Sequence, residues 1–92
     1  MKTLILDQNE ISEITALEKA EINNLEKLYL NNNNINNIKV FENVNFNNLI
    51  NLNLSSNKIN DISALENCEF NKLTDLNLSK NEIKKIFIKK VF

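Results

Sequence analysis

One frame of residues recurs along this chain at a fixed interval of 24 positions. The frame is L-x-x-L-x-L-x-x-N-x-I, and its copies begin at Leu25, Leu49 and Leu73, with a fourth copy at Met1, where methionine replaces the first leucine. Such self-similarity is typical of a solenoid, because a single repeat cannot bury its apolar side until neighbours stack on it. We therefore predict one solenoid domain over 1–92. Its repeats are expected at 1–24, 25–48, 49–72 and 73–92, the last with an irregular C-terminal end.

Each repeat combines two apolar periodicities. Leucines at frame positions 4 and 6 flank one outward residue, which is the alternation of a half-buried strand. After the asparagine at position 9, apolar residues follow at steps of three, as in Ile11, Ile14 and Leu17, and this step indicates a short helical or 3₁₀ segment. The step continues to inward positions at Ala20, Val44 and Cys68. The predicted fold class is therefore an α/β solenoid, with a short parallel β-sheet on one face and 3₁₀ or short helical segments on the other.

The asparagine at frame position 9 recurs where each strand bends toward its return segment. Backbone groups that leave the sheet there need partners, and an asparagine amide offers both donors and an acceptor. We predict that these side chains form an internal structural ladder that serves their own and the adjacent repeat. Its members are Asn9, Asn33, Asn57 and Asn81.

These frames resemble the leucine-rich repeat family over essentially the whole chain. The segments Ile11-Ser12-Glu13-Ile14-Thr15-Ala16-Leu17 and Ile59-Asn60-Asp61-Ile62-Ser63-Ala64-Leu65 are similar to the class found in internalins and protein-phosphatase regulatory subunits. The 24-residue repeats are longer than is usual for that class and lack the proline that often follows the second isoleucine. The resemblance implies a curved solenoid with the parallel sheet on its concave face, and protein binding by that face.

Composition narrows the function classes. Hydrophobic residues make up 42% of the chain and charged residues 25%, and a net charge of −1 provides no general attraction to nucleic acid or an anionic membrane. No apolar run approaches the roughly 20 residues of a membrane span. The start of the chain does not look like a secretory signal, and Cys68 is the single cysteine, so a cytoplasmic location is expected.

The chain contains no glycine and no proline. Its turns must therefore be formed by residues that tolerate left-handed backbone, and asparagine is the usual substitute. Roughly a quarter of the residues are asparagine. An A/T-rich genome is the simplest explanation for the exposed ones, because asparagine, isoleucine and lysine codons are rich in A and T.

An enzymatic function finds no support in the motifs. The chain has no histidine, no Gly-rich phosphate loop and no paired-cysteine spacing, so we expect no cofactor, no metal and no small-molecule substrate. Cys68 is expected to be a small buried hydrophobe rather than a reactive thiol. The basic C-terminal end, Lys84 to Lys90, is better explained as a solvated cap than as a nucleic-acid or membrane contact.

The outward positions of the predicted strands are the best candidate site. Ile5 and Tyr29 lie side by side on an otherwise polar sheet, and exposed large apolar side chains suggest a contact surface. Strand propensity alone is the competing explanation. The other candidate partner-binding residues are Lys27, Thr3, Asn31, Asn51, Asn53, Asp75 and Asn77.

Two functions from different classes follow. The first is a non-enzymatic protein–protein interaction module that binds a protein partner through the concave face. The alternative is a structural or assembly protein that self-associates, as a homo-oligomer, through uncapped solenoid ends. Apolar residues gather at both ends of the sequence: Met1, Leu4 and Leu6 at one, and Phe87, Ile88, Val91 and Phe92 at the other.

Overall fold

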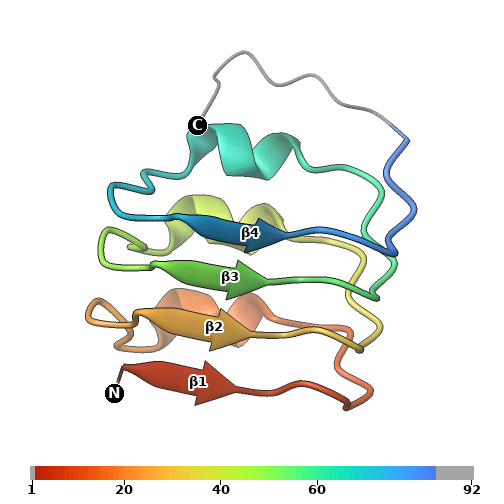
Figure 1. The fold of residues 1–92 in the computed structure, drawn as a ribbon, viewed down its shortest axis with the longest axis horizontal. Helices are drawn as coiled ribbons and strands as arrows, with labels where there is room; N and C mark the ends of the chain where they lie inside the picture. Colours follow the sequence, from red (N-terminus) through yellow and green to blue (C-terminus); the bar gives the residue numbers. More distant parts are fainter. Residues whose placement is uncertain (1, 85–92) are drawn as a thin grey trace.

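A computed structural model describes residues 2–84. Its sheet has four parallel strands in the order β1-β2-β3-β4, one from each repeat (Figure 1). The strands are β1 (Thr3–Ile5), β2 (Lys27–Tyr29), β3 (Asn51–Asn53) and β4 (Asp75–Asn77). Pairing partners occupy the same frame position in neighbouring repeats, as in Leu4 with Leu28 and Leu28 with Leu52. The predicted 24-residue period therefore sets the register of the sheet directly.

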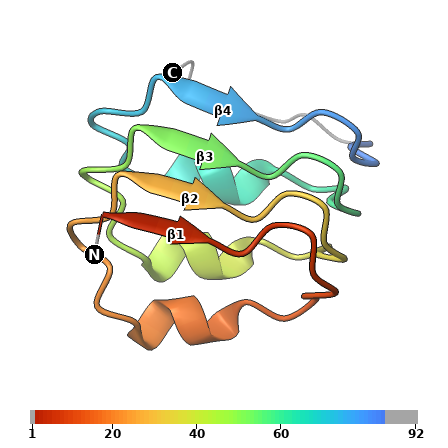
Figure 2. The same cartoon turned by 60° about the horizontal axis from the view of Figure 1, so that its bottom comes forward.

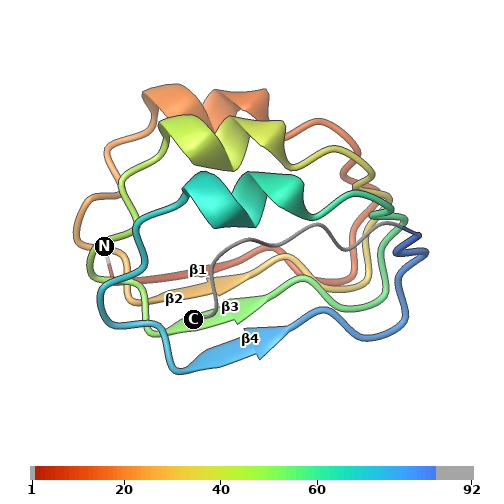
Figure 3. The same cartoon turned by 90° about the horizontal axis from the view of Figure 1, so that it is seen from above.

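A short 3₁₀ helix returns each of the first three repeats behind the sheet. These helices are η1 (Thr15–Lys19), η2 (Lys39–Asn43) and η3 (Ser63–Asn67), and they form a second layer parallel to the strands (Figure 3). Figure 2 shows the same two layers from a lower angle, with the strands side by side above the helices. The predicted α/β solenoid, with 3₁₀ segments opposite the sheet, is confirmed.

The core fills the space between the two layers. It is densest in the second and third repeats, where Leu28 and Leu52 are fully buried, whereas Leu4 and Leu76 at the same frame position are half-buried. Three aromatic rings pack against one another: Phe46 contacts Phe41 edge-on at a centroid distance of 5.3 Å and stacks on Phe70 at 5.8 Å. Stacked neighbours on both sides are what complete the burial of a repeat.

One burial prediction needs correction, and two buried residues were not predicted. Val40 and Ala64, which lie outside the three-residue step, are buried because the tight 3₁₀ turns of η2 and η3 bring a second side chain onto the core. Ala20 was expected to point inward with Val44 and Cys68, but it is exposed. It follows η1 in the first repeat, and the structure places a neighbouring repeat on only one side of it.

Frame position 8 has left-handed backbone in all four repeats. The φ angles are 56° at Gln8, 59° at Asn32, 56° at Ser56 and 55° at Lys80. The expectation that asparagine would supply such turns is right at Asn32 and wrong at the other three. In the first three repeats the position-8 N–H donates to the position-7 carbonyl of the next repeat at 2.9–3.0 Å, so stacking stabilises the conformation there.

Within the described residues, no helix is long and apolar enough to cross a membrane.

Candidate functional site

Three of the four frame asparagines, Asn33, Asn57 and Asn81, bond to the backbone of two successive repeats. Asn57 shows the full pattern: its Nδ2 donates to the carbonyl of Leu54 in its own repeat and to that of Leu30 in the preceding repeat, both at 3.0 Å. Its Oδ1 accepts the backbone N–H of Ile35 at 3.0 Å. Only 6% of Asn57 is exposed, so this side chain serves the scaffold and not a partner.

Asn33 in the second repeat and Asn81 in the fourth make the equivalent hydrogen bonds. The Nδ2 of Asn33 reaches the carbonyls of Leu6 and Leu30, and its Oδ1 accepts from Ile11. Asn9 differs: it is exposed, and its Nδ2 donates to two carbonyls of its own repeat, at 3.1 Å each. The asparagine bonds therefore join repeats one to four in series.

The outward side chains of the strands form two rows across the sheet. One row pairs Ile5, Tyr29, Asn53 and Asn77, and the other pairs Thr3, Lys27, Asn51 and Asp75. We call this surface the concave face. The remaining candidate, Asn31, lies just past β2, where its Nδ2 donates to Asn32 Oδ1 at 2.9 Å. Eight of the nine candidate residues are thus brought together on one surface, with Asn31 at its margin.

The apolar end of the concave face lies over β1 and β2. Ile5 is 60% exposed, and among the described residues it is the large hydrophobic side chain that remains in solvent. Its partner in register, Tyr29, is half-buried. Since the other large apolar side chains of the described part are buried or half-buried, Ile5 is a clear departure from the pattern of the fold.

The polar end lies over β3 and β4 and contains two oriented amides. Asn53 Oδ1 accepts from both the backbone N–H (3.0 Å) and the hydroxyl (2.7 Å) of Ser55. Asn77 Oδ1 accepts from Ser79 in the same way, at 3.0 and 2.8 Å. The two serines were not among the predicted site residues, although the shared Asn-x-Ser spacing could have pointed to them.

A shallow hollow of about 490 Å³ lies over the polar end of the concave face and extends to Tyr29 on β2. It is open to solvent and too shallow to enclose a small molecule as a typical ligand pocket does. Thr74 and Leu76 belong to it although the sequence did not suggest them. Its lining residues are Tyr29, Asn51, Asn53, Thr74, Asp75, Leu76 and Asn77.

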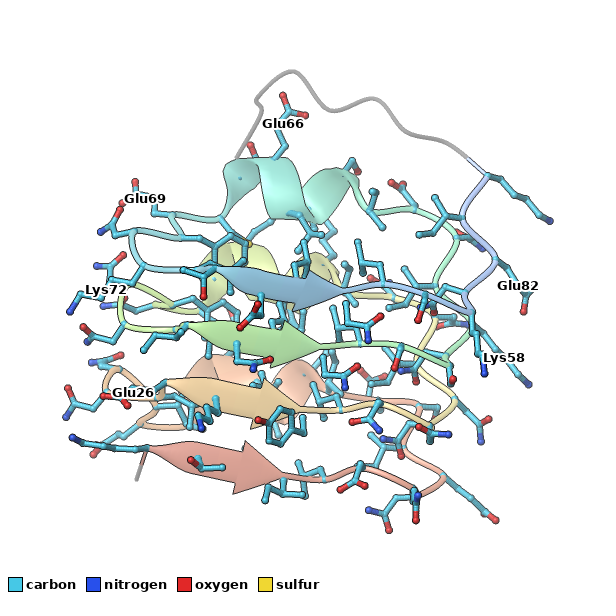
Figure 4. The ribbon with its side chains drawn as sticks, in the orientation of Figure 1. Glu26, Lys58, Glu66, Glu69, Lys72 and Glu82 are labelled. Atoms are coloured by element: carbon cyan, nitrogen blue, oxygen red, sulfur yellow. The ribbon has the colours of Figure 1, made fainter. Side chains whose placement is uncertain are left out.

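Charges are sparse over the strands. Within the four strands the charged residues are Lys27 and Asp75, which lie in the same row two strands apart. The charged side chains labelled in Figure 4, such as Glu26, Lys58 and Glu82, lie around the ends of the strands or behind them. Glu26 pairs there with Lys2 at 3.7 Å. The concave face is therefore a largely neutral surface with one positive and one negative group.

Cys68 has the environment of a packing residue. Its Sγ lies 3.4 Å from the carbonyl oxygens of Phe41 and Ala64. Burial, with a smaller contribution from the negative charge of Glu42, raises the pKa of the Cys68 thiol to about 11. The described part of the chain contains no group of three or more histidine, cysteine or acidic side chains that could hold a metal ion.

Two predictions depend on residues outside the described range: that the basic C-terminal end is a solvated cap, and that apolar residues at the two ends mediate self-association. Met1 and residues 85–92, which include Phe87, Ile88, Val91, Phe92 and most of the basic end, are not part of the description.

Comparison with known proteins gives a consistent result. The family model described as Leucine Rich Repeat matches residues 24–44 and 48–70. The structure of internalin C2 from Listeria monocytogenes superposes with a TM-score of 0.78 and 31% sequence identity, over 95% of this chain and 36% of that protein. A second internalin from Listeria monocytogenes, inlF, gives a TM-score of 0.72 and 29% identity over 94% and 23% of the two chains. The chain thus spans 36% of the first internalin and 23% of the second, and no curated protein matches its sequence.

Proposed function

This chain belongs to the leucine-rich repeat family, and from that premise we propose that it binds a protein partner through the concave face. Leucine-rich repeat domains and internalin-like folds generally mediate protein–protein interactions. The side chains that the sheet presents indicate which surface binds the partner.

The observation that carries the proposal is the exposure of Ile5 beside Tyr29. A β-branched side chain that is 60% exposed loses the free energy of apolar burial, and contact with a partner would recover it. Tyrosine adds a large, rigid contact area and one hydroxyl at little entropic cost. Together these two side chains offer an apolar anchor at one end of a polar surface.

The scaffold supports this use because it holds the anchor in place before binding. The strand pairs fix Ile5 and Tyr29 in register, and Asn33 ties the backbone just past β1 to that just past β2. A surface that is already ordered has less conformational entropy to lose on association. Affinity can then come from a small number of contacts.

A pull-down from the source cell tests the proposal, with immobilised wild-type chain and two variants compared. Tyr29→Ala removes the aromatic anchor, and Lys39→Ala changes an exposed residue of the same repeat on the opposite layer. We expect Tyr29→Ala to lose the recovered partner while remaining folded by circular dichroism, and Lys39→Ala to retain it. Equal recovery by both variants would move the binding surface away from the concave face.

Self-association through the outer repeats is the second candidate. In its favour, the described part pairs β1 with β2 alone, which leaves one edge of β1 open, and Leu4 and Leu6 beside it are half-buried. Light scattering over a concentration series distinguishes the two candidates. A mass that rises with concentration and returns to that of the monomer on substitution of Leu4 by lysine would favour assembly.

A further inference from the structure

We infer that the hollow over β2 to β4 is a subsite for a neutral carboxamide, the side chain of a glutamine or asparagine in the partner. This inference rests on the proposed function, because the hollow belongs to the concave face. It follows from the way in which the donors and acceptors around the hollow are fixed.

The donors come from Asn53 and Asn77. Each Oδ1 already accepts two hydrogen bonds from the serine two residues on, which uses both of its lone pairs. The backbone N–H in each pair also decides the orientation of the amide, since an N–H can donate to the oxygen but not to the NH₂ group. The Nδ2 groups make no hydrogen bond within the described part of the chain, and strand pairing places the two residues side by side on strands about 4.8 Å apart. They form a pair of N–H donors with fixed orientation.

The acceptor comes from Asp75. It precedes Asn77 by two residues on the same face of β4, which corresponds to about 7 Å along the strand. Its carboxylate is exposed and, when ionised, can only accept hydrogen bonds. The hollow therefore has N–H donors at the side of Asn53 and Asn77. At the other side it has the negatively charged acceptor Asp75 and, beside it, the amide of Asn51, which can donate or accept.

A bound group has to satisfy both sides. A carboxylate would accept from the two amides but would lie close to the like charge of Asp75. A lysine ammonium would pair with Asp75 but would direct its donors at amides whose oxygens are already occupied. A primary carboxamide has a carbonyl oxygen for Asn53 and Asn77 and an NH₂ group for Asp75, and it introduces no charge.

The apolar pair in the same row sets the rest of the motif. The centre of the Ile5–Tyr29 pair lies two strand spacings, roughly 10 Å, from the centre of the Asn53–Asn77 pair. An extended peptide advances about 3.3 Å per residue. Side chains on one face of an extended peptide are separated by two or four residues, so the partner segment is expected to carry a large apolar side chain at one of these spacings from its glutamine or asparagine.

Selection from a random peptide library displayed on phage tests the inference. We expect enriched sequences to share an apolar residue and a glutamine or asparagine at one of these spacings. For one such peptide, synthetic versions with Gln, Glu or Lys at the selected position are then titrated against the wild-type chain. The Gln peptide is expected to bind about tenfold more tightly than either charged version, because a site arranged to hydrogen-bond one group rejects a close analogue that cannot pair.

The variant Asp75→Asn identifies the cause of that preference. It removes the negative charge but keeps the size of the side chain, so the Glu peptide should come within about twofold of the Gln peptide. Peptides that lose binding to Tyr29→Ala yet bind equally with Gln, Glu or Lys would overturn the carboxamide subsite and leave the proposed function standing. Peptides indifferent to Tyr29→Ala, or a selection without enrichment, would count against both.

Discussion

The backbone N–H of Ile35 donates to the Oδ1 of Asn57, which lies 3.0 Å away in the next repeat. The N–H of Ile35 lies beyond the end of β2, where it has no partner in the sheet, and Asn57 of the next repeat supplies that partner. The same amide donates to Leu30 and Leu54, so one side chain serves the backbone of two repeats. The regular stack depends on such shared bonds as well as on apolar burial.

Replacement of Asn57 by alanine should therefore destabilise the chain strongly. It leaves buried backbone groups of two repeats without partners, and the expected loss is about 1–3 kcal/mol in the free energy of unfolding. Asn60→Ala, at an exposed position of the same repeat, should change it by less than about 0.5 kcal/mol. Urea unfolding curves measure both, and similar losses for the two variants would argue against the structural role of Asn57.

At one frame position, the loss of unfolding free energy on replacing leucine by alanine should increase with the burial of that leucine. Leu52 is fully buried between two stacked repeats, so Leu52→Ala should cost about 2–5 kcal/mol. Leu4 occupies the equivalent position but is half-buried, so Leu4→Ala should cost less than half as much. Thermal or urea unfolding of the two variants checks the order, and a reversed order would contradict the packing described for the first and third repeats.

Because the backbone at frame position 8 is left-handed, substitution by glycine at that position should stabilise the folded chain. Ser56 has a φ of 56°, a region that costs a residue with a Cβ atom about 1–2 kcal/mol relative to glycine. After the extra entropy that glycine loses on folding, Ser56→Gly should gain roughly 0.5–1 kcal/mol. Ser63→Gly, inside η3, should instead destabilise the chain. If both changes destabilise in urea unfolding, the strain at Ser56 is negligible.

The buried thiol predicts a pH-dependent reactivity. Because the pKa of Cys68 is raised from its ordinary 9.0 to about 11, the folded chain at pH 8 should react with a disulfide reagent about a hundredfold more slowly than the chain in urea. The stability contributed by the neutral thiol is fully present below pH 9 and is lost as the pH rises through 11. Fast labelling of the folded chain at pH 8 would show that the thiol is accessible.

The fold could be predicted well because the same pattern of apolar residues recurs every 24 positions. Once Leu28 and Leu52 are recognised as equivalent, the pairing of β2 with β3 and the inward and outward sides of both strands follow from the alternation of a strand. The bends were harder to predict. Ser56 adopts left-handed backbone against its own preference, and its N–H donates to Ser79 of the next repeat, a contact that the local sequence does not reveal.

Local hydrogen bonds explain what the sequence missed at the candidate site. The outward placement of Asn53 and Asn77 follows from strand alternation alone. The orientation of their amides depends on Ser55 and Ser79, whose hydroxyls reach back within the same strand end. Such a contact depends on side-chain rotamers, which hydrophobic periodicity does not specify.

The affinity of the recovered partner for matched variants tests the role of the concave face most directly. Isothermal titration calorimetry would compare the wild-type chain with Tyr29→Ala and Lys39→Ala, each first shown to be folded. Truncation of an anchor residue costs about 2 kcal/mol or more, so Tyr29→Ala should weaken binding at least about 30-fold. Lys39→Ala, on the opposite layer, should stay within about twofold. Equal dissociation constants for the two variants would contradict the account.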